Sequence, residues 1–122
     1  MALIPNEAIT YFENGIYLPM LITILERDRE SIVSGPFKLQ SPYLTIIDGA
    51  LRIVHAELLA TNTYMKRNNM KLVRGANDGS FTEFTFIYDG YEDRRRYLNV
   101  RLRNHSGELL GEYFAKASRA NA

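Results

Sequence analysis

The chain has 122 residues, of which 46% are hydrophobic and 24% charged, so we expect a single folded domain over residues 1–122 with a real hydrophobic core. Its net charge of +1 gives the molecule as a whole no electrostatic attraction to nucleic acid or to an anionic membrane. It contains no cysteine, which excludes disulfides, thiolate catalysis and cysteine-ligated zinc.

Neither targeting nor membrane insertion is expected from the N-terminal third. The opening residues, MALIPNE, lack the basic region of a signal peptide and carry an acidic residue early. The longest apolar run, Ile16–Leu25, is about half of the roughly 20 residues that a membrane-spanning helix needs. We therefore expect a cytoplasmic protein that does not associate with a membrane.

Two interpretations fit residues 9–18. Apolar residues flank Asn14 and Gly15, and an Asn-Gly pair between apolar runs is typical of a β-hairpin. Alternatively, a short helix begins at Asn6 and ends with Gly15 in a left-handed conformation. We favour the helix, because the residues from Pro5 onward resemble a helix start.

A second helix is predicted to follow. Pro19 suits its first turn, where the missing N–H costs little. Leu21, Leu25 and Ile32 then recur at helical spacing, and the Ser34–Pro36 segment ends the helix.

The longest predicted helix spans Ser41–Asn69, with Ser41 as its N-cap and Pro42 at its first helical position. Two adjacent apolar seams predict a central place in the core. The first consists of Leu44, Ile47, Leu51, Val54, Leu58 and Met65; the second, one residue back, consists of Tyr43, Ile46, Ala50, Ile53, Ala60 and Tyr64. At about 1.5 Å per residue the helix is roughly 40 Å long, more than the ~30 Å width of a small domain. It must bend, near Gly49, or overhang, and an overhang suggests a homodimer.

An antiparallel hairpin is predicted after this helix. Met70–Arg74 has the composition of a short strand, residues 75–80 form a turn, and Phe81–Tyr88 alternates as a second strand. Its aromatic face, with Phe84, Phe86 and Tyr88, is expected to pack against the long helix.

The segment after Gly90 has two interpretations. As a helix it carries an apolar stripe (Tyr91, Leu98, Leu102, Leu109, Tyr113) and acidic residues near its start. As strands, Leu98, Val100 and Leu102 alternate with arginines. Residues Asn104–Gly107 then form a turn into a further strand over Glu108–Phe114, and the sheet has four strands. We predict the helix, because the stripe covers more residues. The predicted class is α+β: N-terminal helices and a long central helix on a small antiparallel hairpin, with a C-terminal helix.

Catalytic chemistry has few candidates. The two histidines, His55 and His105, belong to different predicted elements, and each fits a surface position better than proton transfer. The sequence has no phosphate-binding glycine loop, nucleophile elbow or two-histidine metal spacing. Arginines interleave the carboxylate clusters and neutralise the charge that a hard metal needs. We predict no enzymatic activity, no metal and no cofactor.

A group of arginines between residues 94 and 103 is the main binding candidate. The hypothetical binding set is Arg94, Tyr97, Asn99, Arg101 and Arg103. If this segment is a helix, one side of it carries Arg94, Tyr97 and Arg101. If it is a strand, one face carries Arg95, Tyr97, Asn99, Arg101 and Arg103. Alternatively, the arginines only form weak surface pairs with nearby carboxylates.

Arginine and tyrosine are typical of protein-interface hot spots. We therefore predict a regulatory or accessory protein that binds another protein. The alternative is a nucleic-acid-binding regulator that uses the same arginines.

Overall fold

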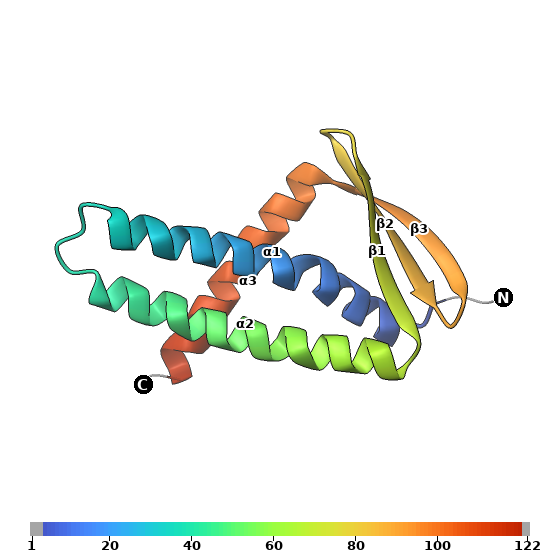
Figure 1. Ribbon diagram of the computed structural model, residues 1–122, viewed down its shortest axis with the longest axis horizontal. Coiled ribbons are helices and arrows are strands. Elements are labelled where there is room, and N and C mark those ends of the chain that lie inside the picture. The colour runs from blue at the N-terminus through green and yellow to red at the C-terminus, as the bar shows by residue number, and fades with distance from the viewer. Residues whose placement is uncertain (1–3, 121–122) are drawn as a thin grey trace.

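The computed structural model describes residues 4–120 and contains three helices and one three-stranded sheet. The elements follow in the order α1 (Asn6–Ser34), α2 (Ser41–Arg67), β1 (Met70–Asn77), β2 (Phe81–Tyr88), β3 (Tyr91–Leu98) and α3 (Asn99–Ala120). Helices α1 and α2 form a long antiparallel pair, the sheet covers the end where α1 begins, and α3 crosses the pair (Figure 1). The predicted α+β class is confirmed. The first residues of the signal-peptide prediction, 1–3, lie outside the described part.

Helix α1 is one continuous helix where the sequence predicted two, so both the hairpin at Asn14 and the helix end at Gly15 are wrong. Gly15 serves close packing instead of a turn: a Cβ at this position would lie 3.1 Å from Leu72 Cδ2 of β1. Pro19 lies inside the helix instead of at its start. Burial of the flanking apolar residues on other elements outweighs the backbone hydrogen bond that a proline removes.

Two hydrophobic clusters are joined through α1. In the first, Phe12 of α1 stacks on Phe86 of β2, with ring centroids 4.5 Å apart and planes 4° from parallel. In the second, the fully buried Leu21 and Leu25 of α1 pack among residues of α2 and α3. The aromatic face of the sheet therefore packs on α1 as well as on Met65 of α2, and not on the long helix α2 alone.

Helix α2 begins and ends close to its predicted bounds. Pro42 occupies the first turn as predicted, but the N-cap is Gln40 and not Ser41, its side chain makes no capping hydrogen bond, and the helix ends at Arg67. Helix α1 runs alongside α2 (Figure 1), so a second long helix accommodates its length. The two are also joined by an ion pair, with Arg29 Nε 2.7 Å from Asp48 Oδ1.

Residues 91–98 form a third strand, which corrects the helix predicted from Tyr91. Strands β2 and β3 pair with Tyr88 opposite Tyr91, across a two-residue turn at Asp89 and Gly90. Both turn residues have positive φ, 47° and 85°, as a type I′ hairpin requires. The Asp-Gly pair, which the sequence interpretation passed over, was the signal for this turn. Beyond it the alternative also fails: Glu108–Phe114 is helical and the sheet has three strands, not four.

Among residues 4–120, one helix, α1, is long and apolar enough to cross a membrane by length and composition alone. In the structure Leu18, Leu21 and Leu25 of this helix are buried against α2 and α3. The core therefore takes up part of the apolar surface of α1, since 39% of its most apolar stretch is buried.

Replacing the two glycines of α3 by alanine is expected to stabilise the fold. Gly107 and Gly111 are exposed inside a helix, and a Cβ at either position would meet no atom within 4 Å. Each substitution should raise the free energy of unfolding by about 1 kcal/mol, measured by urea denaturation. Gly79→Ala is the contrasting variant and should destabilise, because Gly79 has a φ of +95°. A lower free energy of unfolding in both α3 variants would contradict the free space around Gly107 and Gly111.

Candidate functional site

The five residues predicted to bind do not share one face. Arg94 and Tyr97 lie on opposite faces of β3, because side chains separated by an odd number of positions alternate along a strand. Arg101 and Arg103 lie on nearly opposite sides of the first turns of α3, being two residues apart in a helix. Asn99 is the first residue of α3 and is engaged in hydrogen bonds. Neither the helical nor the strand version of the predicted surface is therefore formed.

Tyr97 is a packing residue of the inner sheet face. Its ring meets Phe84 edge to face, with centroids 5.7 Å apart, and its hydroxyl donates to Glu13 Oε2 of α1 at 3.4 Å. Burial, with Glu13 nearby, raises the pKa of the Tyr97 hydroxyl to about 12. Its neighbour Arg95 also points inward: the guanidinium lies 4.8 Å from the Phe86 ring centroid.

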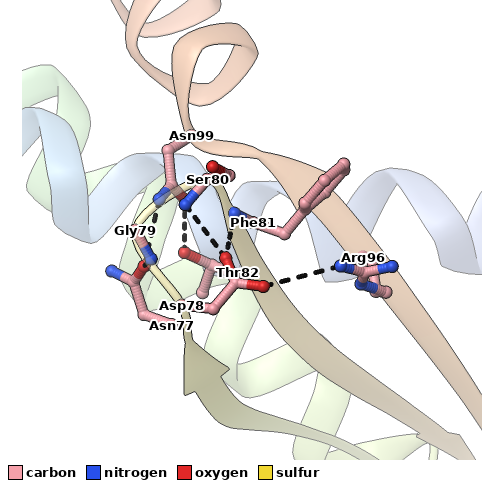
Figure 2. Close-up of polar contacts among 8 residues, drawn as sticks. All are labelled: Asn77, Asp78, Gly79, Ser80, Phe81, Thr82, Arg96 and Asn99. Carbon is pink, nitrogen blue, oxygen red and sulfur yellow. Dashed lines mark hydrogen bonds and ion pairs between the residues drawn. The ribbon is translucent and has the colours of Figure 1, made fainter.

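The turn between β1 and β2 is held by two side chains of the turn itself (Figure 2). Asp78 Oδ1 accepts hydrogen bonds from the backbone N–H groups of Ser80, at 2.9 Å, and Phe81, at 2.8 Å. Asn77 Oδ1 accepts from the N–H of Gly79 at 2.9 Å. Asp78 Oδ2 lies 3.6 Å from Arg96 Nη2 of β3, so the turn is also tied to the neighbouring edge of the sheet.

Asn99 fastens this turn to the start of α3 (Figure 2). Its backbone N–H donates to the carbonyl of Ser80 at 2.8 Å, and its side-chain amide donates to Asn77 Oδ1 at 3.0 Å. The hydroxyl of Thr82, which is only 2% exposed, donates to Asn99 Oδ1 at 2.6 Å. We call Asn77, Asp78, Thr82 and Asn99 the junction clamp. It sets the direction in which the chain leaves the sheet as α3.

Beside the clamp lies an exposed strip, which we call the junction surface: Arg94, Arg96, Leu98 and Val100. The first three alternate along the outer face of β3, which the described helices do not cover. Leu98 and Val100 are 40% and 49% exposed, whereas the sequence placed Leu98 on a core-facing stripe. The Arg96 guanidinium lies 4.2 Å from the Phe81 ring centroid. Within residues 4–120, no carboxylate pairs with Arg94.

On the other side of the clamp is a groove of about 650 Å³ between α1, the inner sheet face and α3. Its lining includes the apolar residues Ile16, Met20, Ile24, Leu72, Phe84 and Leu102 and the polar residues Arg74, Asn77, Thr82, Asn99 and Arg103. Sequence reasoning selected Asn99 and Arg103 but missed Arg74 and Asn77. No spacing in the sequence could have joined them, because four separate elements contribute the lining.

The two histidines lie apart from this groove and from the clamp. His55 is exposed on α2, while the His105 ring meets Tyr17 edge to face at 4.7 Å. His105 Nδ1 lies 3.3 Å from Glu108 Oε2 on the same helix. Among the described residues, no three acidic or histidine side chains lie close enough together to hold a metal ion.

Comparison with known proteins gives one consistent result. The family model described as "YhjD protein" matches residues 3–118. The chain is also 34% identical over 108 residues to "Uncharacterized protein YhjD" of Bacillus subtilis (strain 168), an alignment that covers 88% of this chain and 90% of that protein. No solved structure matches the chain. The family match thus extends over all three strands and nearly all of the three helices.

Removing the clamp amide should destabilise the fold. Asn99→Ala leaves the buried Thr82 hydroxyl without its acceptor and should lower the free energy of unfolding by about 1–3 kcal/mol, measured by urea denaturation. Asn104→Ala is the matched control, because Asn104 is exposed on the same helix. The clamp would be disproved as a stabilising element if both variants had the stability of the parent chain.

The clamp carboxylate should make stability depend on pH. Backbone N–H groups of Phe81 and Ser80 hold the pKa of the Asp78 carboxyl below its usual value in the folded state, with Arg96 as a further cause. The stabilisation is therefore present above the unfolded pKa of about 4 and is lost as the pH falls through the lower, folded value.

Thermal melts from pH 7 to pH 3 on the parent chain and on Asp78→Asn provide the test. The parent should melt higher at pH 7, and the difference should shrink in acid. A difference that stays constant across this range would contradict the assigned charge effect.

Proposed function

Because the chain belongs to the YhjD family, whose description states no activity, we propose its function from its geometry: it is a non-catalytic accessory protein that binds another protein through the junction surface. The surface combines two exposed apolar side chains, Leu98 and Val100, with two arginines. We further propose a cytoplasmic location, since Leu18, Leu21 and Leu25 of α1 are buried against the other helices.

The exposure of Leu98 and Val100 is the observation that supports this proposal most directly. Both side chains continue the outer edge of the sheet onto α3, where residues 4–120 leave nearly half of each exposed. Apolar groups next to arginine are the composition of a protein-interface centre, where burial provides the energy and the guanidinium provides directed hydrogen bonds. Arg94 has a free guanidinium for such bonds within the described chain.

Nucleic-acid binding remains the second candidate, and it is favoured by the two outer-face arginines, Arg94 and Arg96. Two features weigh against it. Acidic residues share the same face, because Glu83 lies opposite Arg96 in the sheet register and Glu92 also points outward. Leu98 and Val100 would also gain little from contact with a phosphate backbone, which supplies most of the affinity in such complexes.

The histidines do not support a catalytic role. His55 and His105 are on different helices; the His105 ring packs edge to face on Tyr17, and its Nδ1 lies 3.3 Å from the exposed Glu108. A general acid or base needs a reacting group held within hydrogen-bond reach, usually in a site that excludes water. Neither histidine has such surroundings.

The test is quantitative capture of the protein partner with a double variant of the apolar pair. Leu98→Ser with Val100→Ser should reduce capture from a lysate of the source organism, or self-association by analytical ultracentrifugation, at least tenfold. The melting temperature should stay close to that of the parent, because both residues are exposed. Leu59→Ser is the matched control, since Leu59 is 69% exposed on α2, outside the junction surface.

Two results would overturn the proposal. One is unchanged partner capture and self-association by the double variant. The other is tight binding of labelled RNA or DNA, measured by fluorescence anisotropy. Its association constant should fall by about 0.9 log units per phosphate contact for each tenfold rise in salt concentration. The second result would favour the nucleic-acid alternative, and Arg94→Gln with Arg96→Gln should then reduce that salt dependence.

A further inference from the structure

We propose that the groove between α1, the inner sheet face and α3 binds a small single-chain carboxylate, a ligand with an unbranched apolar tail and an anionic head. None of the four residues of the junction surface lines this groove, although Arg103 also borders the hollow beside Leu98 and Val100. The site does not depend on the proposed protein binding. Its volume of about 650 Å³ falls within the usual range for small-molecule sites.

The apolar part of the groove has the shape that an extended chain requires. Ile16, Met20 and Ile24 line it from α1 and recur every four residues, so they form a row along one side of that helix. The row is about 12 Å long at 1.5 Å per residue. Leu72 and Phe84 face it from the sheet. An unbranched tail of comparable length, such as that of decanoate, matches this lining.

The polar part of the groove offers hydrogen-bond donors, and two of these donor groups are cationic. Asn77, Thr82 and Asn99 are bonded to one another in the junction clamp. By contrast, the guanidinium groups of Arg74 and Arg103 are exposed, and neither is paired with a carboxylate in the part of the chain that the structure describes. A ligand group that accepts hydrogen bonds and carries negative charge is the best complement to these two guanidinium groups.

The clamp also joins the two elements that carry these arginines. Arg103 lies one helical turn after Asn99 on α3. On β1 an irregularity in the strand register puts Arg74 opposite Phe84 and Asn77 opposite Thr82, so both lie on the inner face of the sheet. The hydrogen bond between Asn99 and Asn77 connects β1 to α3, and both arginines line the groove. Two planar guanidinium groups are suited to a carboxylate, whose two oxygens accept parallel hydrogen bonds.

Isothermal titration calorimetry with decanoate, below its micelle concentration, tests the site. The parent chain should bind one decanoate, while decyltrimethylammonium, with the same tail and opposite charge, should bind at least tenfold more weakly. Arg74→Gln with Arg103→Gln should weaken decanoate binding at least tenfold. Arg27→Gln with Arg119→Gln is the matched control, because it removes two exposed arginines that belong to neither the groove nor the junction surface. This control should bind decanoate as the parent does.

Failure of the folded parent chain to bind decanoate would overturn the proposal. So would equal binding of decanoate and the ammonium compound, or an unchanged affinity in the Arg74→Gln, Arg103→Gln variant. Tighter binding of decyl phosphate than of decanoate would overturn the assignment of a carboxylate head. Loss of decanoate binding in the Leu98→Ser, Val100→Ser variant would contradict the separation of the two sites.

Discussion

Helix α1 is the element on which both halves of the molecule are built. Near its start, Phe12 stacks on Phe86 and attaches the sheet; further along, Leu21 and Leu25 are fully buried among α2 and α3. Because both contacts belong to one rigid helix, the position of the sheet relative to the helical pair is fixed by the length of α1 between them. Gly15 lies between these regions and allows Leu72 of β1 to come close to the helix backbone.

The same arrangement creates the groove. Past Gly15, α1 continues beyond the inner face of the sheet toward the distal end of the helical pair, and α3 begins beside it (Figure 1). If α1 had ended at Gly15, the row formed by Ile16, Met20 and Ile24 would not exist and the groove would have no wall on that side. Continuity of α1 through Pro19 is therefore a condition for the candidate ligand site as well as for the core.

The sequence was informative where one local pattern decided the outcome. The alternation of Phe81–Tyr88 and the helical spacing of α2 predicted a strand and a long helix, and both were found. Most residues of the two apolar seams of α2 are nevertheless only partly buried or exposed. The sequence was misleading where turn chemistry competed with burial: Gly15 resembled a helix end, yet it is a close-packing position in a longer helix. At Asp89 and Gly90 the error was the opposite. The Asp-Gly pair is a strong turn signal, but the prediction followed the apolar stripe that starts at Tyr91, and residues 91–98 form a strand. The groove was not predictable, because the spacing of apolar residues within one element does not indicate which side chains of other elements lie opposite.

The arginines show how secondary structure divides one cluster into different roles. Strand alternation turns Arg95 inward over Phe86 and leaves Arg94 and Arg96 outward, and only Arg94 of these three has no carboxylate partner within the described residues. The change to helix at Asn99 then sends Arg103 to the groove, on the other side of the clamp. Asn99, first selected as a binding residue for its amide, is the point at which these directions are set, because its three hydrogen bonds fix where the strand ends and the helix begins. Any loosening of that junction would reorient Val100 and Arg103 together, so the junction surface and the groove share one structural support even though they are lined by different residues.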